Sequence, residues 1–586
     1  MVRTFPITPY TRRSTTNSLH EDAQFCILEQ FFPDGPDHPF ASTMMKHFKK
    51  LGAPLYSIHK YPSLKEQEQR FTSAGWAQAK ARSLWELWSD DHFVPSSLRM
   101  SLDAIEPFDE WEEFALFASH YFLLRASTRP DSTLDIHDAA ENEAMDVSRQ
   151  FTLLPKPSAG GGQRRFGALI SDGAHSVGHY GGLGRQTRLA STDLYANSDR
   201  ITFPQHAFPS GDVEARMCHT LTDLKDNTCL LVGGRASPAT VFQYCWYRAN
   251  DQWRAVKDMP DPRFRHSAIK VTLNTEYVLI YGGKASGGKT LDTWLLWDSN
   301  SNQWQSVETK EPNLKARFGA CLAAVDDTSG VMFGGMGQDG TILEDFWVWK
   351  LHQRNDGSCF LELEEQTERL RASPLFKYLN RFGATVSQSS QGLIIVGGII
   401  PRQVVPFHKE IMLLDTAGLT RGSENASSEG QIISAIGLGA NFESPRPLLV
   451  GHVSRAVDSD QILILGGGAV CFSFGTFWTE GTWLLQKATS NTDNNWALVP
   501  ESVQQTLSQT QAISGVSGLE ADTTKEKSGS EITTVPRVRV ETASQFQSVL
   551  ADGKPVIITG SDIGPCTELW TQEYLANAVG RDRKVG

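Results

Sequence analysis

Short apolar runs recur along the middle of the chain, and each run ends in a pair of glycines. The pairs stand at 181–182, 233–234, 282–283, 334–335, 397–398 and 466–467. About sixteen residues before each pair lies a second mark, and these marks are Arg165, Arg216, Arg265, Arg317, Arg381 and, without an arginine, Gly451-His452. An aromatic run such as LDTWLLW follows each pair, and a further run carries Trp253, Trp304 or Trp496. Continuous apolar runs of this length between turn residues are typical of buried strands. Each repeat therefore predicts four short strands.

Four strands in a repeat of about fifty residues are typical of a β-propeller blade, and the repeat resembles the kelch repeat. We expect six blades over residues 161–500, with long loops in the later repeats, one of them near 416–431. The glycine pair allows a turn where a side chain would collide with the next strand or blade. The glycine, arginine and tryptophan marks are therefore expected to be scaffold positions and not catalytic ones.

The region before the propeller, residues 21–128, is predicted to be rich in helix with some strand. Apolar residues have helical spacing in SLKEQEQRFTSAGWAQAKARSLWELW, interrupted at Gly75. In the segment that follows, a helical stripe is expected to contain Trp111, Phe114, Phe117, Tyr121 and Leu124. Its first turns hold Asp109, Glu110, Glu112 and Glu113. We interpret these acids as a solvated face favoured by the helix dipole, rather than as paired catalytic carboxylates.

Residues 501–533 are polar, rich in Ser and Thr and nearly free of aromatic residues, which predicts a flexible linker. The remaining residues predict a helix in SQFQSVLADG, a buried strand in KPVIITG and a second helix in TELWTQEYLANAVG. The predicted fold class is thus a multidomain, mainly β protein, with a propeller between an α/β segment and a shorter C-terminal segment.

Composition limits the functions that the chain can have. Its 586 residues predict roughly three or four domains. The net charge of −12 supplies no general attraction for nucleic acid, so RNA binding would need a local basic patch. The eight cysteines include no CxxC pair, which argues against a zinc module or a disulfide scaffold. With neither a signal-like apolar segment nor a long apolar run, we expect a cytoplasmic protein without a membrane partner.

Residues 283–290 fit the phosphate-loop pattern GxxxxGK[ST], but a β-like run follows where that motif needs a helix. We therefore expect a glycine-rich hairpin loop and no nucleotide there. Gly35, Gly52 and Gly75 are isolated, so no glycine-rich cofactor loop precedes residue 160. His452 is the last histidine, and the C-terminal segment cannot build a two-histidine iron site. The residues predict no catalytic, cofactor-binding or metal-binding site.

Three blocks nevertheless carry a family resemblance. FCILEQFFPDGPDHPFASTMMKHFKKLGAPLYSI, YPSLKEQEQRFTSAGW and IEPFDEWEEFALFASHYFLLRAS, in this order, resemble the C-terminal half of the leucine carboxyl methyltransferase family. The segment VETASQFQSVLADGKPVIITGSDIGPCTELWTQEYL resembles the opening of a JmjC-type cupin. A fungal-type branch of that family fuses the methyltransferase to a kelch propeller and such a cupin. The resemblance implies S-adenosylmethionine-dependent carboxyl methylation and methoxycarbonylation of the wybutosine precursor on phenylalanine tRNA.

The resemblance also implies what the chain lacks. In the family the methyl-donor site precedes the block that begins at Phe25, and the cupin's iron ligands would lie beyond Gly586. We therefore expect a chain truncated at both ends that neither binds S-adenosylmethionine nor methylates tRNA. Residues that match the family blocks are expected to pack and to support helices, namely Glu29, Gln30, Asp37, Arg70, Glu106, Asp109, Glu110, His120 and Tyr121.

The expected divisions are an unplaced segment at 1–20, the half methyltransferase domain at 21–130, a linker at 131–160, the propeller at 161–500, the linker at 501–533 and the start of the cupin at 534–586. Two other functions remain open at this point. One is a non-enzymatic kelch scaffold that binds a protein on a propeller face. The other is methylation of a protein's C-terminal leucine, although that branch has no propeller.

Overall fold

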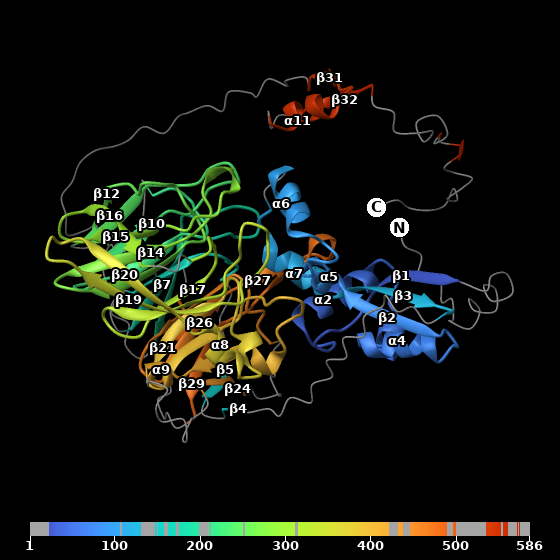
Figure 1. Cartoon of the computed structure of the whole chain (residues 1–586), viewed down its shortest axis with the longest axis horizontal. Coiled ribbons are helices and arrows are strands. Elements are labelled where there is room, and N and C mark those ends of the chain that lie inside the picture. The colour runs from blue at the N-terminus through green and yellow to red at the C-terminus, as the bar shows by residue number, and fades with distance from the viewer. Residues whose placement is uncertain are drawn as a thin grey trace. The chain divides into compact units, whose positions relative to one another are not determined.

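The computed structural model divides the chain into two compact units, residues 1–511 and 512–586 (Figure 1). The boundary falls inside the expected second linker. Within the described residues no helix is both long and apolar enough to cross a membrane. The described residues are 23–105, 108–129, 147–148, 151–156, 162–171, 175–197, 209, 213–249, 252–310, 314–420, 432–437, 446–488, 496–499, 535–551, 555–560, 571 and 573–574. The expected segment 1–20 and the linker 501–533 lie outside them.

The N-terminal region forms a three-stranded antiparallel sheet with the order β1-β3-β2. Its strands are β1 (Gln24–Gln30), β2 (Gln78–Ser83) and β3 (Tyr121–Ser127). Helix α4 (Leu64–Thr72) packs on the sheet through Phe71, which shares a core with Phe122 and Leu124. Ser63 and Glu66 form a capping box that fixes the start of α4.

Two helix predictions in this region are wrong in their extent. Helix α7 (Trp111–Ser119) ends before Tyr121, and the residues from Tyr121 onward alternate between half-buried and buried, which is strand periodicity. The stripe expected to continue to Leu124 is therefore split between a helix and a strand. Likewise Gln78–Ser83 is a strand between two helices, α4 and α5 (Leu84–Trp88). A short apolar run looks the same in the sequence whether it forms a helix or a strand. Its pairing partner in the fold determines which of the two it forms.

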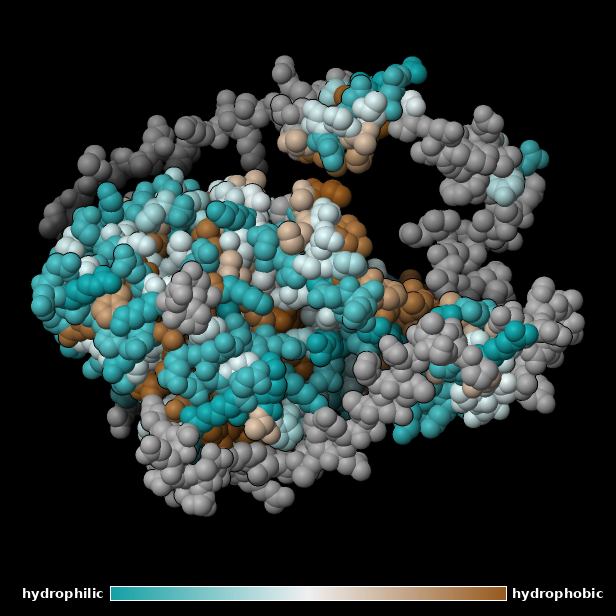
Figure 2. Space-filling view, viewed as in Figure 1, coloured by the Kyte–Doolittle hydropathy of each residue, from teal (hydrophilic) through white to brown (hydrophobic). Residues whose placement is uncertain are grey.

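Helices α2 (Pro39–Lys50), α5 and α7 lie between the small sheet and the propeller (Figure 1). The remaining helices of the region are α3 (Ser57–Lys60) and α6 (Ser96–Ile105). Helix α6 turns Arg99 inward and exposes Leu98, Leu102 and Ile105. Brown, apolar surface is visible at the position of this helix in Figure 2.

The centre of the chain folds into four-stranded antiparallel blades, as the glycine-pair repeat predicts. The first strands of neighbouring blades contact each other in the closed order β6, β9, β13, β17, β21, β25 and back to β6, so the blades form a ring. In chain order, the strands are β6 (Ala168–Ser171), β7 (Ser176–Tyr180), β8 (Thr192–Asn197), β9 (Thr220–Asp223), β10 (Cys229–Val232), β11 (Cys245–Ala249), β12 (Gln252–Val256), β13 (Ser267–Thr272), β14 (Glu276–Tyr281), β15 (Trp294–Asp298), β16 (Gln303–Thr309), β17 (Cys321–Ala324), β18 (Ser329–Phe333), β19 (Phe346–Gln353), β20 (Cys359–Glu365), β21 (Thr385–Ser389), β22 (Gly392–Val396), β23 (Ile411–Leu414), β24 (Ile433–Ile436), β25 (His452–Ala456), β26 (Gln461–Gly466) and β29 (Thr482–Lys487).

Strands from outside the repeats complete two of the blades. Strand β5 (Phe151–Lys156) pairs antiparallel with β29, and β30 (Trp496–Leu498) pairs antiparallel with β8. A third addition, β4 (Val147–Ser148), pairs parallel with β24. The stretch expected to be a linker at 131–160 therefore contributes strands to the propeller. The run with Trp496 belongs to the blade of β8, at the other end of the repeat array from β29.

Short elements fill the connections between strands. The hairpin of β27 (Gly468–Val470) and β28 (Thr476–Trp478) extends from the blade of β26 toward α2 and α7. The other elements are α8 (Thr367–Arg371), α9 (Thr416–Thr420) and the 3-10 turns Ser286–Gly288, Phe376–Tyr378, Phe407–Lys409 and Phe472–Phe474. The phosphate-loop match is a loop closed by the Ser286–Gly288 turn and followed by strand β15, as expected. Most of the predicted long loop at 416–431 lies outside the described residues.

Buried arginines connect five of the six glycine pairs to the start of their blades. A guanidinium Nη1 donates to the carbonyl of the first glycine in five blades, from Arg164, Arg216, Arg263, Arg317 and Arg381. A Cβ on Gly334 would lie 2.3 Å from the carbonyl oxygen of Arg381, so only glycine fits there. The scaffold role is as predicted, but the sequence marks Arg165 and Arg265 are out of register with this set.

The second unit contains β31 (Arg537–Arg539), α11 (Ala543–Ala551) and β32 (Ile557–Thr559), and β31 pairs parallel with β32. The helix and strand are where the sequence predicts them. Ile557 and Ile558 are 40% and 38% exposed, so the strand is not buried as expected. The second predicted helix falls mostly outside the described residues.

Candidate functional site

The mouth of the propeller is rimmed by one residue from each blade, two positions after the scaffold arginine or its equivalent. These residues all have positive φ, and they are Phe166, Cys218, Arg265, Gly319, Gly383 and Gly451. Backbone hydrogen bonds link them from blade to blade: the amide of Arg265 donates to the carbonyl of Cys218 at 2.9 Å, and the amide of Gly319 donates to Arg265 at 2.8 Å. The rim is therefore a rigid frame whose side chains point where the backbone fixes them.

One half of this mouth is basic and the other half is apolar. Arg165, Arg235, Arg265 and Lys284 stand on the blades that start with β6, β9 and β13, and all four are buried. The blades that start with β17, β21 and β25 contribute Phe318, Met336, Phe382, Ile399 and Val450 to an apolar cluster. Such a surface fits an occupant that is acidic on one side and apolar on the other.

Helix α7 of the same chain is that occupant. Both oxygens of Glu112 accept hydrogen bonds from Arg265, at 2.6 Å to Nη1 and 2.8 Å to Nη2, and the carboxylate is 1% exposed. The Arg265 guanidinium lies 4.9 Å from the Phe166 ring and 4.8 Å from the Phe382 ring. A bidentate pair held between aromatic rings is the strong form of an arginine–carboxylate contact.

Three further carboxylates of the N-terminal region meet the other cations of the rim. Glu113 pairs with Arg165, Asp109 pairs with Arg235, and Asp103 lies 3.5 Å from the Lys284 ammonium. Burial raises the pKa of Glu113 to about 7, with Arg165 opposing that shift and Glu112 adding to it. Breaking one partner of such a buried pair costs about 3–5 kcal/mol, because the other charge stays buried.

The apolar half of the mouth receives the apolar side of the same region. Trp85 donates from Nε1 to the carbonyl of Ile400 at 2.8 Å. Trp111 packs over Gly340, where a Cβ would lie 2.5 Å from the indole ring. Trp85, Trp111 and Leu116 belong to the same core cluster as Phe318 and Phe382. The propeller and the N-terminal region thus share one core.

The interpretation of the acidic stretch as a solvated face is therefore wrong for Asp109, which pairs with Arg235, and for Glu112 and Glu113. Glu110 is exposed, as expected, but the two following glutamates are buried against arginines. Both oxygens of Glu112 are engaged, which does not suit a proton-transfer pair. The signal that could have revealed this role is the register of Arg165 and Arg265, which stand one and two residues beyond the scaffold arginines Arg164 and Arg263.

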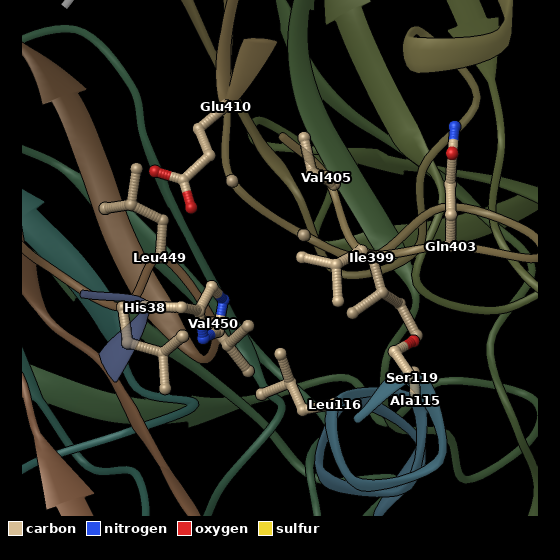
Figure 3. Close-up of a pocket in the computed structure, with 14 residues that line it drawn as sticks. His38, Ala115, Leu116, Ser119, Ile399, Gln403, Val405, Glu410, Leu449 and Val450 are labelled. Atoms are coloured by element: carbon tan, nitrogen blue, oxygen red, sulfur yellow. The ribbon is translucent and has the colours of Figure 1, made fainter. Parts of the chain in front are cut away.

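Beside the mouth, the junction encloses a cavity of about 20 Å³. In Figure 3 the Glu410 carboxylate points into the space between Leu449 and Val405, and Leu116 and Ser119 approach from α7. Burial raises the pKa of Glu410 to about 7, with Arg446 opposing that shift and Asp34 adding to it. A cavity of this size holds about one water molecule.

The residues that match the family blocks take packing and pairing roles. Arg70 pairs with Glu29 at 2.9 Å, and His120 is buried beside Phe40. Burial lowers the pKa of His120 to about 4, so the ring is neutral at physiological pH. Tyr121 stacks with Phe117, Gln30 ends β1, Asp37 is exposed and Asp109 reaches Arg235. Glu106 lies outside the described residues.

The cavity at the junction is too small to hold a molecule of the size of S-adenosylmethionine. Within the described ranges no group of three or more His, Cys, Asp or Glu side chains could hold a metal ion.

The fold and the mouth define a class: a β-propeller whose flanking strands complete its ring and whose mouth is filled by a helix of its own chain. Comparison with known protein families gives a more specific match. Residues 213–481 match the family described as "tRNA wybutosine-synthesizing protein 4, beta-propeller".

Curated relatives extend the similarity to almost the whole chain. The proteins named tRNA wybutosine-synthesizing protein 4 are 62% identical in Aspergillus oryzae over 98% of this chain, and 59% identical in Aspergillus fumigatus over 97%. The Saccharomyces cerevisiae protein of that name is 28% identical over 80% of the chain and 65% of its own length. The chain spans 56% and 54% of the two Aspergillus proteins. These similarities confirm the predicted resemblance to a propeller-containing protein of wybutosine synthesis.

Proposed function

We propose that the chain acts in the synthesis of wybutosine on tRNA. The observation that carries this proposal is the similarity to the Aspergillus oryzae protein, which extends through the propeller and both flanks. The activity we propose is carboxyl methylation followed by methoxycarbonylation of the wybutosine precursor, with phenylalanine tRNA as substrate, in the cytoplasm. S-adenosylmethionine would supply the transferred methyl group.

For the domains, we propose a six-bladed kelch-type propeller, the C-terminal half of a leucine carboxyl methyltransferase-like domain over residues 21–130, and the start of a JmjC/cupin-like domain over 534–586. The ring order of first strands supports the blade number. The helix-covered sheet of β1, β3 and β2 supports an α/β segment before the propeller.

In this function the propeller is a rigid mount for the methyltransferase-like region. The four ion pairs and the shared core hold α7 and, through β3, the small sheet in one orientation. Catalysis by positioning needs such a mount, because a misplacement of about 1 Å can cost on the order of a hundredfold in rate. The same contacts occupy the mouth, which disfavours a free scaffold that binds a separate protein there.

The proposal is tested by disrupting the gene in the organism that carries it and analysing tRNA nucleosides by mass spectrometry. We expect wybutosine to disappear and a precursor with a free side-chain carboxylate to accumulate, and reintroduction of the gene to restore wybutosine. Unchanged wybutosine in the disrupted strain would exclude the function.

For the 586-residue chain by itself, we propose that S-adenosylmethionine does not bind, because Gly35, Gly52 and Gly75 are isolated and form no glycine-rich cofactor loop, and the cavity at the junction is too small for it. Isothermal titration of the chain with the cofactor should give no heat of binding. Micromolar affinity would show that residues of this chain hold the cofactor.

A further inference from the structure

One segment of the N-terminal region has a charge opposite to that of the whole chain. Residues 38–65 contain Lys46, Lys49, Lys50, Lys60 and Lys65 and no Asp or Glu, in a chain of net charge −12. A local basic patch of this kind is what an acidic protein needs in order to bind the phosphates of a nucleic acid.

Four of these lysines lie on two helices that follow each other in the chain and share one core cluster through Met44 of α2 and Ile58 of α3. Lys46, Lys49 and Lys50 lie at positions i, i+3 and i+4 of the last turns of α2, so they share one side of the helix, and all three are exposed. Lys60 ends α3, only ten residues further on, and is exposed too. Lysine ion pairs in the described residues involve other lysines, namely Lys80, Lys270, Lys284 and Lys487.

The helix dipole does not explain this pattern fully. It favours Lys49 and Lys50 at the C-terminal end of α2, but it places no restriction on acids in the loop that follows. The ion pairs at the mouth use acids of the N-terminal region, but residues 38–65 contain no acid. No acid of the segment therefore competes for these four ammonium groups, and the Lys60 ammonium lies over the Tyr61 ring, 5.2 Å from its centroid.

An exposed aromatic ring belongs to the connection between the two helices. Tyr56, at the N-cap of α3, is 82% exposed, and Leu51, at the C-cap of α2, is 63% exposed. Basic side chains combined with an exposed aromatic ring are the usual means of binding unpaired nucleotides, through phosphate contacts and base stacking. An anionic membrane is a poorer fit, because the apolar side of α2, with Phe40, Ala41 and Met44, is already buried in the core.

We propose that Lys46, Lys49, Lys50, Lys60 and Tyr56 form an RNA-binding surface, in which the lysines bind backbone phosphates and the tyrosine stacks on an unpaired base. The partner is a structured RNA with exposed loop nucleotides. This inference rests on the proposed function, which makes that RNA the tRNA substrate.

The test measures binding of a phenylalanine tRNA transcript to the 586-residue chain by fluorescence anisotropy at several salt concentrations. The variant Lys46→Glu/Lys49→Glu/Lys50→Glu should bind at least about tenfold more weakly, and the slope of log affinity against log salt should fall by about 2 to 3. The matched control is Lys225→Glu/Lys257→Glu/Lys350→Glu, which changes the net charge equally at exposed propeller positions. It should bind nearly as well as the parent.

A second pair of variants tests the stacking. Tyr56→Ala should weaken binding about tenfold, and Tyr56→Phe, which keeps the ring, should bind like the parent. Unchanged thermal unfolding in all variants shows that folding is intact, since these side chains are exposed.

The outcomes separate the surface from the function. If both triple variants weaken tight tRNA binding equally, the proposed RNA-binding surface is wrong, and the proposed function is unaffected. If the parent does not bind tRNA, the proposed RNA-binding surface is wrong, and so is the proposal that tRNA is the substrate of this chain. Lysine-dependent binding to phosphatidylserine vesicles without tRNA binding would assign the patch to a membrane instead.

Discussion

The contact between Glu112 and the propeller depends on the absence of a side chain at Gly383. This rim glycine has a φ of +71°, and a Cβ there would lie 2.7 Å from Oε1 of Glu112. Gly383→Ala should therefore suffer both the left-handed backbone cost of about 1–2 kcal/mol and an overpacking cost of about 1–3 kcal/mol. Urea unfolding followed by tryptophan fluorescence measures the sum.

Gly35→Ala is the matched control, because Gly35 also has positive φ, +81°, but nothing within 4 Å of the added methyl group. It should lose only the backbone part. Equal losses in the two variants would mean that Glu112 does not sit over Gly383.

At the scale of elements, the seams between blades contain buried neutral histidines. His266 exchanges a hydrogen bond of 2.8 Å with Thr220 of the preceding blade, and His452 does the same with Thr385 at 3.0 Å. Burial, together with a smaller contribution from the nearby charge of Arg263, lowers the pKa of His266 to about 3. Below pH 6.5 this histidine is protonated in the unfolded chain, where its pKa is near 6.5, but stays neutral in the folded protein. Stability from this residue is thus present above pH 6.5 and lost as the pH falls toward 3.

His266→Gln should flatten the decline in unfolding free energy below pH 6.5 by up to about 1.4 kcal/mol per pH unit relative to the parent. Glu113 and Glu410 act in the opposite direction, since their raised pKa values favour proton uptake in the fold, but they are common to both proteins and cancel in the comparison. Parallel pH profiles would contradict a neutral His266 at the seam.

The sequence was sufficient to predict the blades but not the site. The glycine-pair strands are buried on both faces, so their apolar runs are continuous and their period is visible. The role of Arg265 depends on its register relative to Arg263, which is set by hydrogen bonds to Gly282 and not by residue type. The boundary between α7 and β3 depends likewise on pairing with β1, a strand almost a hundred residues away. Local patterns do not contain such long-range partners.

At the scale of the whole molecule, segments on both sides of the repeats complete the propeller. Trp496 of β30 is buried in one cluster with Tyr195 of β8 and Leu463 of β26. Its removal would therefore expose the core between two blades. A chain that ends at residue 488 should unfold several degrees lower in calorimetry than the parent, because about 2–5 kcal/mol of buried aromatic packing is lost. A chain that ends at 511 keeps β30 and removes only the second unit, and its propeller should unfold at the parental temperature. Equal unfolding temperatures for both truncations would show that β30 does not close the ring.

Amide hydrogen exchange gives the most direct test of the claim that α7 fills the propeller mouth. In the parent, the amides of residues 114–119 should open with a free energy close to that of the rim amides of Cys218 and Gly319, which donate hydrogen bonds from blade to blade. In Arg265→Ala, α7 should lose protection by about 3 kcal/mol while the seams of distant blades keep theirs. If the amides of α7 exchange rapidly in the parent while those of the rim are protected, α7 does not fill the propeller mouth.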